Sequence, residues 1–154
     1  MTVHQITEDT QEVKLTAEQI SYVIHELLQS GHLSGDQIVV GGDAALVLSN
    51  KRFAAPCIDV YVGSELFDKF HSTGKFLCTP AFCPWERRTI NVLKLPMNVF
   101  IHQIFKDVYL SHVVSKQYGF NVMAIESIYA YKTALNRAED QNDIRVLKEA
   151  LAIR

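Results

Sequence analysis

The first clear pattern along the chain is helical. After Thr16, apolar residues recur at intervals of three and four positions, which places them on one face of a helix. The residues on this face are Ile20, Val23, Ile24, Leu27 and Leu28. Glu18 lies in the first turn, and Gly31 and Gly35 follow the last apolar residue. The pattern therefore predicts a helix between Thr16 and Gly31.

Shorter patterns fill the rest of the chain. Apolar runs and alternating segments predict strands over residues 37–40, 57–62, 75–78, 88–93 and 97–104. Further helices are predicted over residues 43–48, 64–72, 124–137 and 142–153, while residues 107–116 fit either a helix or a strand. Strands in the middle of the chain and helices at its end favour an α+β fold, a mixed sheet backed by helices, with C-terminal helices.

The composition is that of one globular domain. The chain has 154 residues, 48% of them hydrophobic, which predicts a single domain over residues 1–154 with residues 1–12 flexible. Its net charge of -2 argues against a protein that coats DNA broadly by charge. No apolar run reaches the length of a membrane span, and the N-terminus is too polar for a secretory signal. We read the three cysteines as reduced thiols and expect a cytoplasmic protein.

Two adjacent glycines, Gly41 and Gly42, separate the strand over residues 37–40 from the helix over residues 43–48. Glycine lets the backbone turn tightly and approach a ligand, and the free N–H groups of a helix start suit a phosphate. A plain turn between a strand and a helix favours the same residues, so both interpretations stay open. The pair is neither a P-loop nor a dinucleotide-binding fingerprint, because neither motif is completed by the residues that follow.

An acidic residue interrupts the strand over residues 57–62. Its alternate apolar residues form one face, and Cys57, Asp59 and Tyr61 share the other. A carboxylate in mid-strand is disfavoured unless its face opens on a cleft, a cation or a partner, or lies in solvent at a sheet edge. The sequence leaves these settings of Asp59 open.

The segment GGDAALVLSNKRFAAPCIDVYV resembles the core of the nucleotidyltransferase superfamily, and most of all its small AbiEii-like or minimal type. The matching residues are Gly41, Gly42, Ala44, Arg52 and Asp59. In that family the glycine pair holds a nucleoside triphosphate, and carboxylates on neighbouring strands bind two Mg²⁺ ions for attack on the α-phosphate. The resemblance implies that Gly41, Gly42 and Arg52 bind a nucleotide, and that Asp59 is the metal ligand and catalytic carboxylate.

The C-terminal segment AIESIYAYKTALNRAEDQNDIRVLKEAL resembles the helical segment of the same family. Its matching residues are Lys132, Arg137, Asp140 and Asp143. The resemblance implies that Lys132 reaches the phosphates of the nucleotide. Lys132 shares a helical stripe with apolar residues, which fits a lysine that points into a cleft or one that extends to the surface. The three-residue spacing of Arg137 and Asp140 is more often structural than chemical.

The carboxylates depart from the family pattern. The second acid is expected at position 61, which is Tyr61, and the third on a strand within residues 88–104. The outward-facing candidates there are Asn91, Asn98, Phe100 and His102, and none is acidic. Nothing in the spacing places Asp43, Glu65 or Asp68 at the site. One carboxylate in place of three cannot balance two divalent ions, so we expect two-metal catalysis to be lost or strongly altered.

Other residues give weaker indications. Cys78 and Cys83, with His71 nearby, lack the spacing and the second ligand pair of a zinc site. The loop over residues 79–87 contains a tryptophan, which fits an interaction surface or a side chain folded onto the core. His102 either enters a cleft or is hydrogen-bonded in place. A catalytic Cys–His pair is not favoured, because three cysteines and six histidines make chance pairing easy.

The resemblance implies a nucleotidyltransferase-like protein with a degenerate site that binds a nucleotide, an RNA or a protein partner. It also implies a role in a toxin–antitoxin or phage-associated system. The alternative is an active, Mg²⁺-dependent enzyme that uses a nucleoside triphosphate and transfers a nucleoside monophosphate to an unknown acceptor. A second alternative is a protein-interaction domain with no nucleotide role.

Overall fold

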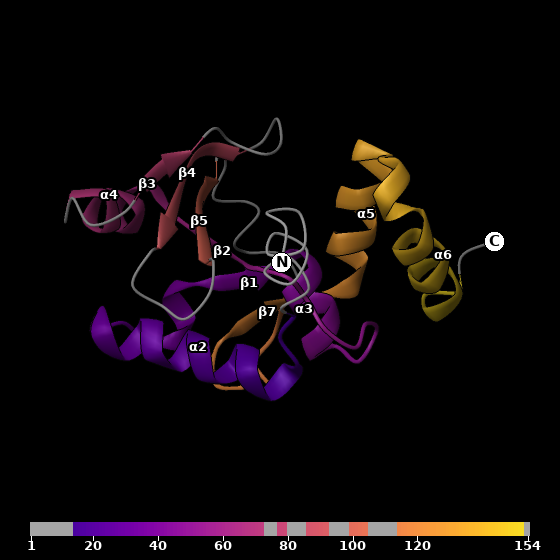
Figure 1. Cartoon of the computed structure of the whole chain (residues 1–154), viewed down its shortest axis with the longest axis horizontal. Coiled ribbons are helices and arrows are strands. Elements are labelled where there is room, and N and C mark those ends of the chain that lie inside the picture. The colour runs from indigo at the N-terminus through magenta and orange to yellow at the C-terminus, as the bar shows by residue number, and fades with distance from the viewer. Residues whose placement is uncertain (1–13, 73–76, 80–85, 93–98, 105–113, 153–154) are drawn as a thin grey trace, which may run out of the picture.

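The computed structural model describes residues 14–72, 77–79, 86–92, 99–104 and 114–152 (Figure 1). The helices in these ranges are α2 (Ala17–Ser30), α3 (Gly42–Leu48), α4 (Ser64–Ser72), α5 (Ile125–Leu135) and α6 (Gln141–Ala150), with short 3₁₀ helices η1 (Gly35–Gln37) and η3 (Ala138–Asp140). The strands are β1 (Val39–Gly41), β2 (Ile58–Val62), β3 (Leu77–Thr79), β4 (Glu86–Val92), β5 (Val99–Ile104), β6 (Val114–Ser115) and β7 (Asn121–Met123).

The described strands form one mixed sheet in the order β3-β4-β5-β2-β1-β7-β6. β2 lies at its centre, antiparallel to β1 on one side and parallel to β5 on the other. β7 adds a second parallel pair beside β1. The predicted α+β class, with a mixed sheet backed by helices and with C-terminal helices, is confirmed.

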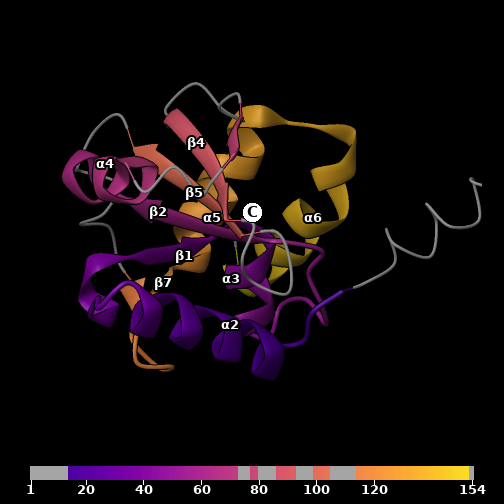
Figure 2. The ribbon, with the colours of Figure 1, turned by 60° about the vertical axis from the view of Figure 1, so that its left-hand side comes forward.

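The helices that pack with the sheet come from both the early and the late parts of the chain. The apolar face of α2 is buried as its periodicity predicts, and α2 packs on α3. α5 and α6 pack on each other, and α5 also contacts α3. Figure 1 places this helical pair at the opposite end of the molecule from α4, and in Figure 2 α6 again lies on the other side of the sheet from α4. None of the described helices has the length and apolar character needed to span a bilayer.

The helix boundaries follow the local signals in the sequence. Thr16 is the N-cap of α2, and its backbone N–H donates to the side chain of Gln19, which completes a capping box. α4 has the predicted bounds, and the late helices are present as α5 and α6, each shorter than predicted. β1 begins later than predicted because Gln37 closes the turn of η1, where its side chain accepts from the N–H of Ser34.

Two further differences from the prediction concern β7 and β4. β7 was not predicted: it is only three residues long and buried throughout, which is too short to show a period. β4 begins at Glu86, two residues before the predicted start, and this brings an acidic side chain into the sheet.

Some predictions lie outside the described residues. These are the flexible N-terminus, the loop positions 80–85 with Cys83 and Trp85, residues 75–76, 93 and 97–98 of the predicted strands, and residues 107–113 of the ambiguous segment. Residues 114 and 115 form β6, and Cys78 is the middle residue of β3.

Candidate functional site

The two glycines make room for two side chains of β2. Gly41 pairs with Asp59 across the antiparallel β1–β2 ladder. A Cβ at Gly41 would come within 2.6 Å of the Tyr61 ring, and a Cβ at Gly42 within 2.6 Å of Oδ2 of Asp59. Gly42 also has a φ of +59°, which other residues rarely adopt. The glycine pair is thus required by packing against β2, whatever ligand the turn binds.

Tyr61 is buried, although the alternation of β2 grouped it with Asp59 on the face away from the core. Only 3% of Tyr61 is exposed, because its ring covers Gly41 and stacks on His102 with ring centroids 4.8 Å apart. Its hydroxyl donates to Oε1 of Glu86 over 3.2 Å. The position expected for a second acid therefore holds a buried aromatic side chain that contributes a hydrogen bond.

Asp59 is held by His102 on the neighbouring strand. The parallel β2–β5 register pairs Asp59 with Phe100 and Tyr61 with His102, so the imidazole reaches back to the carboxylate. Nε2 of His102 donates to Oδ1 of Asp59 over 2.7 Å. Nδ1 lies 2.9 Å from the hydroxyl of Thr89 and 3.3 Å from Oε2 of Glu86. Of the two roles foreseen for His102, the structure supports the one in which hydrogen bonds hold it in place.

The two carboxylates change the charge state of His102. Burial alone would lower its pKa, but the hydrogen bonds and negative charges of Asp59 and Glu86 outweigh this and raise the pKa to about 9. At neutral pH the imidazole is therefore a buried cation between two acids. Its burial, with 1% of the residue exposed, keeps water from screening these interactions.

Glu86 is a second carboxylate beside Asp59, and the expectation of a single acid at this site is wrong. Only 6% of Glu86 is exposed, and it borders the same cleft as Asp59. Little in the sequence indicates this role, because Glu86 falls within the loop predicted over residues 79–87 and is followed by two arginines. A shift in the β4–β5 register between Glu86 and Arg88 turns the acid toward the interior.

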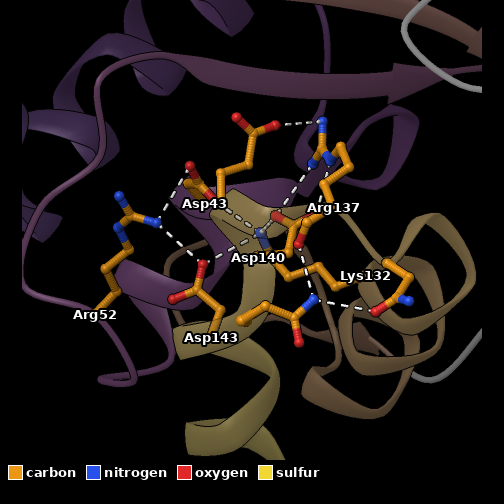
Figure 3. A network of polar contacts seen from close by, with 9 residues as sticks. Asp43, Arg52, Lys132, Arg137, Asp140 and Asp143 are labelled. Carbon is orange, nitrogen blue, oxygen red and sulfur yellow. Dashed lines mark hydrogen bonds and ion pairs between the residues drawn. The ribbon is translucent and has the colours of Figure 1, made fainter.

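A second cluster surrounds Lys132 on α5 (Figure 3). Only 3% of its side chain is exposed, and Nζ lies 3.1 Å from Asp43, 3.0 Å from Asp140 and 3.2 Å from Asp143. Burial alone would lower the pKa of Lys132, but these carboxylates raise it. Lys132 thus holds α3, η3 and α6 together, and all of its charge is engaged within the protein.

Two arginines complete this cluster (Figure 3). Arg52 bridges Asp43 and Asp143 at 3.3 and 3.1 Å, and Arg137 donates to Asp140 over 2.6 Å. Burial alone would raise the pKa of Asp140, but hydrogen bonds from Arg137 and Lys132 lower it. The cluster pairs three basic side chains with three aspartates, so it is balanced in charge.

One cleft of about 330 Å³ joins the two clusters. It contains most of the residues that the resemblance singled out, although they extend from Gly42 to Asp143 along the chain. These are Gly42, Arg52, Asp59, Lys132, Arg137, Asp140 and Asp143. Gly41 does not line it, because Tyr61 and Met123 cover that residue. Asp43, which nothing in the spacing placed at the site, lines it as well.

The two other candidate acids lie elsewhere. Asp68 on α4 pairs with Arg88 on β4, and Glu65 lies in the exposed first turn of the same helix. Neither borders the cleft. They do not supply the missing carboxylates.

Cys57 also lines the cleft, but its thiol is unreactive. Burial, with the charges of Asp59 and Asp43, raises its pKa to about 12. Because the thiolate is the nucleophilic form, a thiol with this pKa is inert at neutral pH. This weighs further against a Cys–His mechanism at this site.

The described side chains do not fit two Mg²⁺ ions. Both oxygens of Glu86 are engaged, Oε1 by Tyr61 and Oε2 by His102, and Oδ1 of Asp59 is engaged by His102. Asp43, Asp140 and Asp143 are neutralised by basic side chains. Within the described ranges, no three histidine, cysteine or acidic side chains are grouped so that they would hold a metal. No described side chain makes a hydrogen bond or ion pair with Oδ2 of Asp59, but one such oxygen does not hold two hard cations.

Comparison with protein families, with characterised proteins and with solved structures finds no match for this chain.

Proposed function

We propose that this protein is a nucleotidyltransferase-like protein that binds a ligand in the cleft and does not carry out two-metal transfer. The hydrogen bond between His102 and Asp59 is the observation that carries the proposal. The strand beside β2 contributes an imidazole, where the chemistry of the family needs a further carboxylate. In place of a metal-binding group of carboxylates, the cleft thus has a carboxylate that is paired with a histidine of the same chain.

The arrangement of the chain supports the nucleotidyltransferase-like part of the proposal. β1, the glycine turn, α3 and β2 follow one another as in the stretch that carries the resemblance. The C-terminal stretch that resembles the same family lies beside this turn, where Lys132 contacts Asp43. Two weak motifs that are far apart in the sequence thus belong to one cleft.

A transfer assay tests the loss of catalysis. The full chain is incubated with each α-labelled nucleoside triphosphate, Mg²⁺ or Mn²⁺, and RNA and protein acceptors. We expect no more transfer from the wild type than from Asp59→Asn. Asp36→Asn is the matched control, since Asp36 is an exposed acid on η1 that pairs with Lys116. Robust metal-dependent transfer that Asp59→Asn abolishes and Asp36→Asn retains would overturn the proposal.

Thermal shifts measured with nucleoside triphosphates, with and without Mg²⁺, test the binding part. Stabilisation without metal supports a nucleotide as the ligand. No response directs the search to RNA or a protein partner in the same cleft.

The second candidate function is an active Mg²⁺-dependent nucleotidyltransferase, and Glu86 favours it. Glu86 and Asp59 border the same cleft, so the site has two carboxylates rather than one. For Glu86 to bind a metal, its contacts with Tyr61 and His102 would have to break. The transfer assay separates this candidate from the first.

We further propose a cytoplasmic location and a role in a toxin–antitoxin or phage-associated system. The free thiol of Cys57 is consistent with a reducing compartment. Cell fractionation tests the location, and the change in growth when the chain is expressed alone tests the role.

A further inference from the structure

Each basic side chain of the cleft is already paired with an acid. Lys132, Arg52 and Arg137 line the cleft, and each already contacts at least one aspartate within 3.3 Å. An incoming phosphate would compete with the aspartates for these basic groups, and full transfer of Lys132 to it would leave buried carboxylates unpaired at a large cost. The cleft therefore does not present the positive surface that an unchelated triphosphate needs.

The cleft instead has an excess of negative charge. The carboxylates that line it are Asp43, Asp59, Glu86, Glu139, Asp140 and Asp143. Six acids thus face three basic side chains, and His102 behind them adds one further cation. Potential in a cleft is focused by its low-dielectric walls, so this excess attracts cations.

Asp59 is the acid of the cleft that is prepared to bind. Its Oδ1 accepts from His102, while no described side chain makes a hydrogen bond or ion pair with its Oδ2, and 20% of the side chain is exposed. Behind it, the buried side chains of Thr89, His102 and Glu86 form a hydrogen-bonded group that fixes the carboxylate. Buried polar groups that converge on one cleft-facing acid are characteristic of functional sites.

An aromatic side chain lies next to this carboxylate. Phe100 is the partner of Asp59 across the β2–β5 ladder, is partly exposed, and lines the cleft together with Tyr131 of α5. An aromatic ring beside a carboxylate binds organic cations, since the ring face attracts the same charge that the acid neutralises. The volume of about 330 Å³ suits a small molecule.

We propose that the cleft binds a small organic cation, an ammonium or guanidinium group that donates to Oδ2 of Asp59 beside the ring of Phe100. This inference names the ligand class of the proposed cleft and rests on the proposed function only in taking that cleft as the binding site. It holds whether the bound molecule is a ligand or an acceptor substrate. The result of the transfer assay above therefore does not decide whether this inference is correct.

The test is isothermal titration of the full chain with spermidine, agmatine and phenethylamine, against ATP without metal and 4-guanidinobutyrate. The last compound keeps the guanidinium of agmatine and replaces its ammonium by a carboxylate. We expect saturable binding of at least one cation, weakened by added salt, and at least tenfold weaker binding of 4-guanidinobutyrate and of metal-free ATP.

Three variants locate the site. Asp59→Asn should weaken cation binding at least tenfold, and Phe100→Leu about threefold to tenfold, while Asp36→Asn leaves it unchanged. Circular dichroism tests whether each variant is folded, and Phe100→Leu keeps the test valid where Asp59→Asn is not folded. The inference is overturned where no cation binds saturably, where Asp36→Asn weakens binding as much as the cleft variants, or where metal-free ATP binds more tightly than every cation.

Discussion

Nε2 of His102 lies 2.7 Å from Oδ1 of Asp59, and the two residues belong to parallel neighbouring strands. On its other side the imidazole faces Glu86 and Thr89, and the ring of Tyr61 stacks on it. One buried cation thus joins two acids that would otherwise repel each other in a low-dielectric setting. The proton on His102 therefore affects both the stability of the sheet and the charge of the cleft.

We expect the protein to lose stability at alkaline pH, where the His102 imidazole loses its proton. The folded pKa of His102, about 9, is above its unfolded value of 6.5, so folding favours the protonated form. Its contribution, about 3 kcal/mol, is full below pH 6.5, declines between pH 6.5 and 9, and is absent above. Urea denaturation from pH 6 to 9.5 measures it, and in His102→Asn this decline should be absent. An equal decline in both proteins would place the titrating group elsewhere.

The cluster around Lys132 predicts an unusually damaging single substitution. Lys132→Met leaves Asp43, Asp140 and Asp143 without their shared cation, and removal of one partner of a buried ion pair costs about 3–5 kcal/mol. Lys116→Met is the matched control, because Lys116 is exposed and pairs only with Asp36 on the surface. It should cost less than about 1 kcal/mol. The measurement is the free energy of unfolding in urea, and similar losses in both variants would contradict the assigned role of Lys132.

The glycine turn predicts a coupled effect. Gly42→Ala places a methyl group 2.6 Å from Oδ2 of Asp59 and forces a non-glycine residue to a φ of +59°, so it should destabilise by about 1–3 kcal/mol. Gly31→Ala is the control, since Gly31 has a φ of −90° and its nearest neighbour is the flexible side chain of Leu33. It should change stability by less than about 0.5 kcal/mol.

A double-mutant cycle separates the two parts of this effect. Asp59→Ala removes the carboxylate that the new methyl group would meet, so Gly42→Ala should cost about 1 kcal/mol less in that background. Additive losses in the cycle would show that backbone strain alone explains the need for glycine.

The sequence predicted the elements whose signal is local. α2 and α4 have at least two turns of helical periodicity, and the sequence of β2 alternates, although Tyr61 is buried together with the apolar residues. β7 has three buried residues and no period of its own, since its burial comes from contact with β1. An element this short is defined by tertiary packing, which a single sequence does not express.

The site was predictable in its parts but not in its pairing. The sequence motifs identified five residues that all line one cleft: Asp59, Lys132, Arg137, Asp140 and Asp143. The charge balance was not predictable, because it depends on contacts such as that of Lys132 with Asp43, which are 89 positions apart. Glu86 was missed because the start of β4 was predicted two residues too late, and because the register shift between Glu86 and Arg88 that turns the acid inward has no signal in the sequence.

The last prediction concerns the reactivity of Cys57. A pKa of about 12 leaves about one thiol in 10,000 ionised at pH 8, so alkylation by iodoacetamide should be slow and should accelerate about tenfold per pH unit up to pH 10. A variant with Cys78→Ser and Cys83→Ser isolates the signal. In that background Asp59→Asn should speed the reaction, because the charge of Asp59 helps to raise the pKa of the thiol. Urea-unfolded protein supplies the reference rate of an ordinary cysteine. A folded rate equal to that reference would show that the cleft does not suppress the thiolate, and with it that Asp59 does not impose a negative potential there.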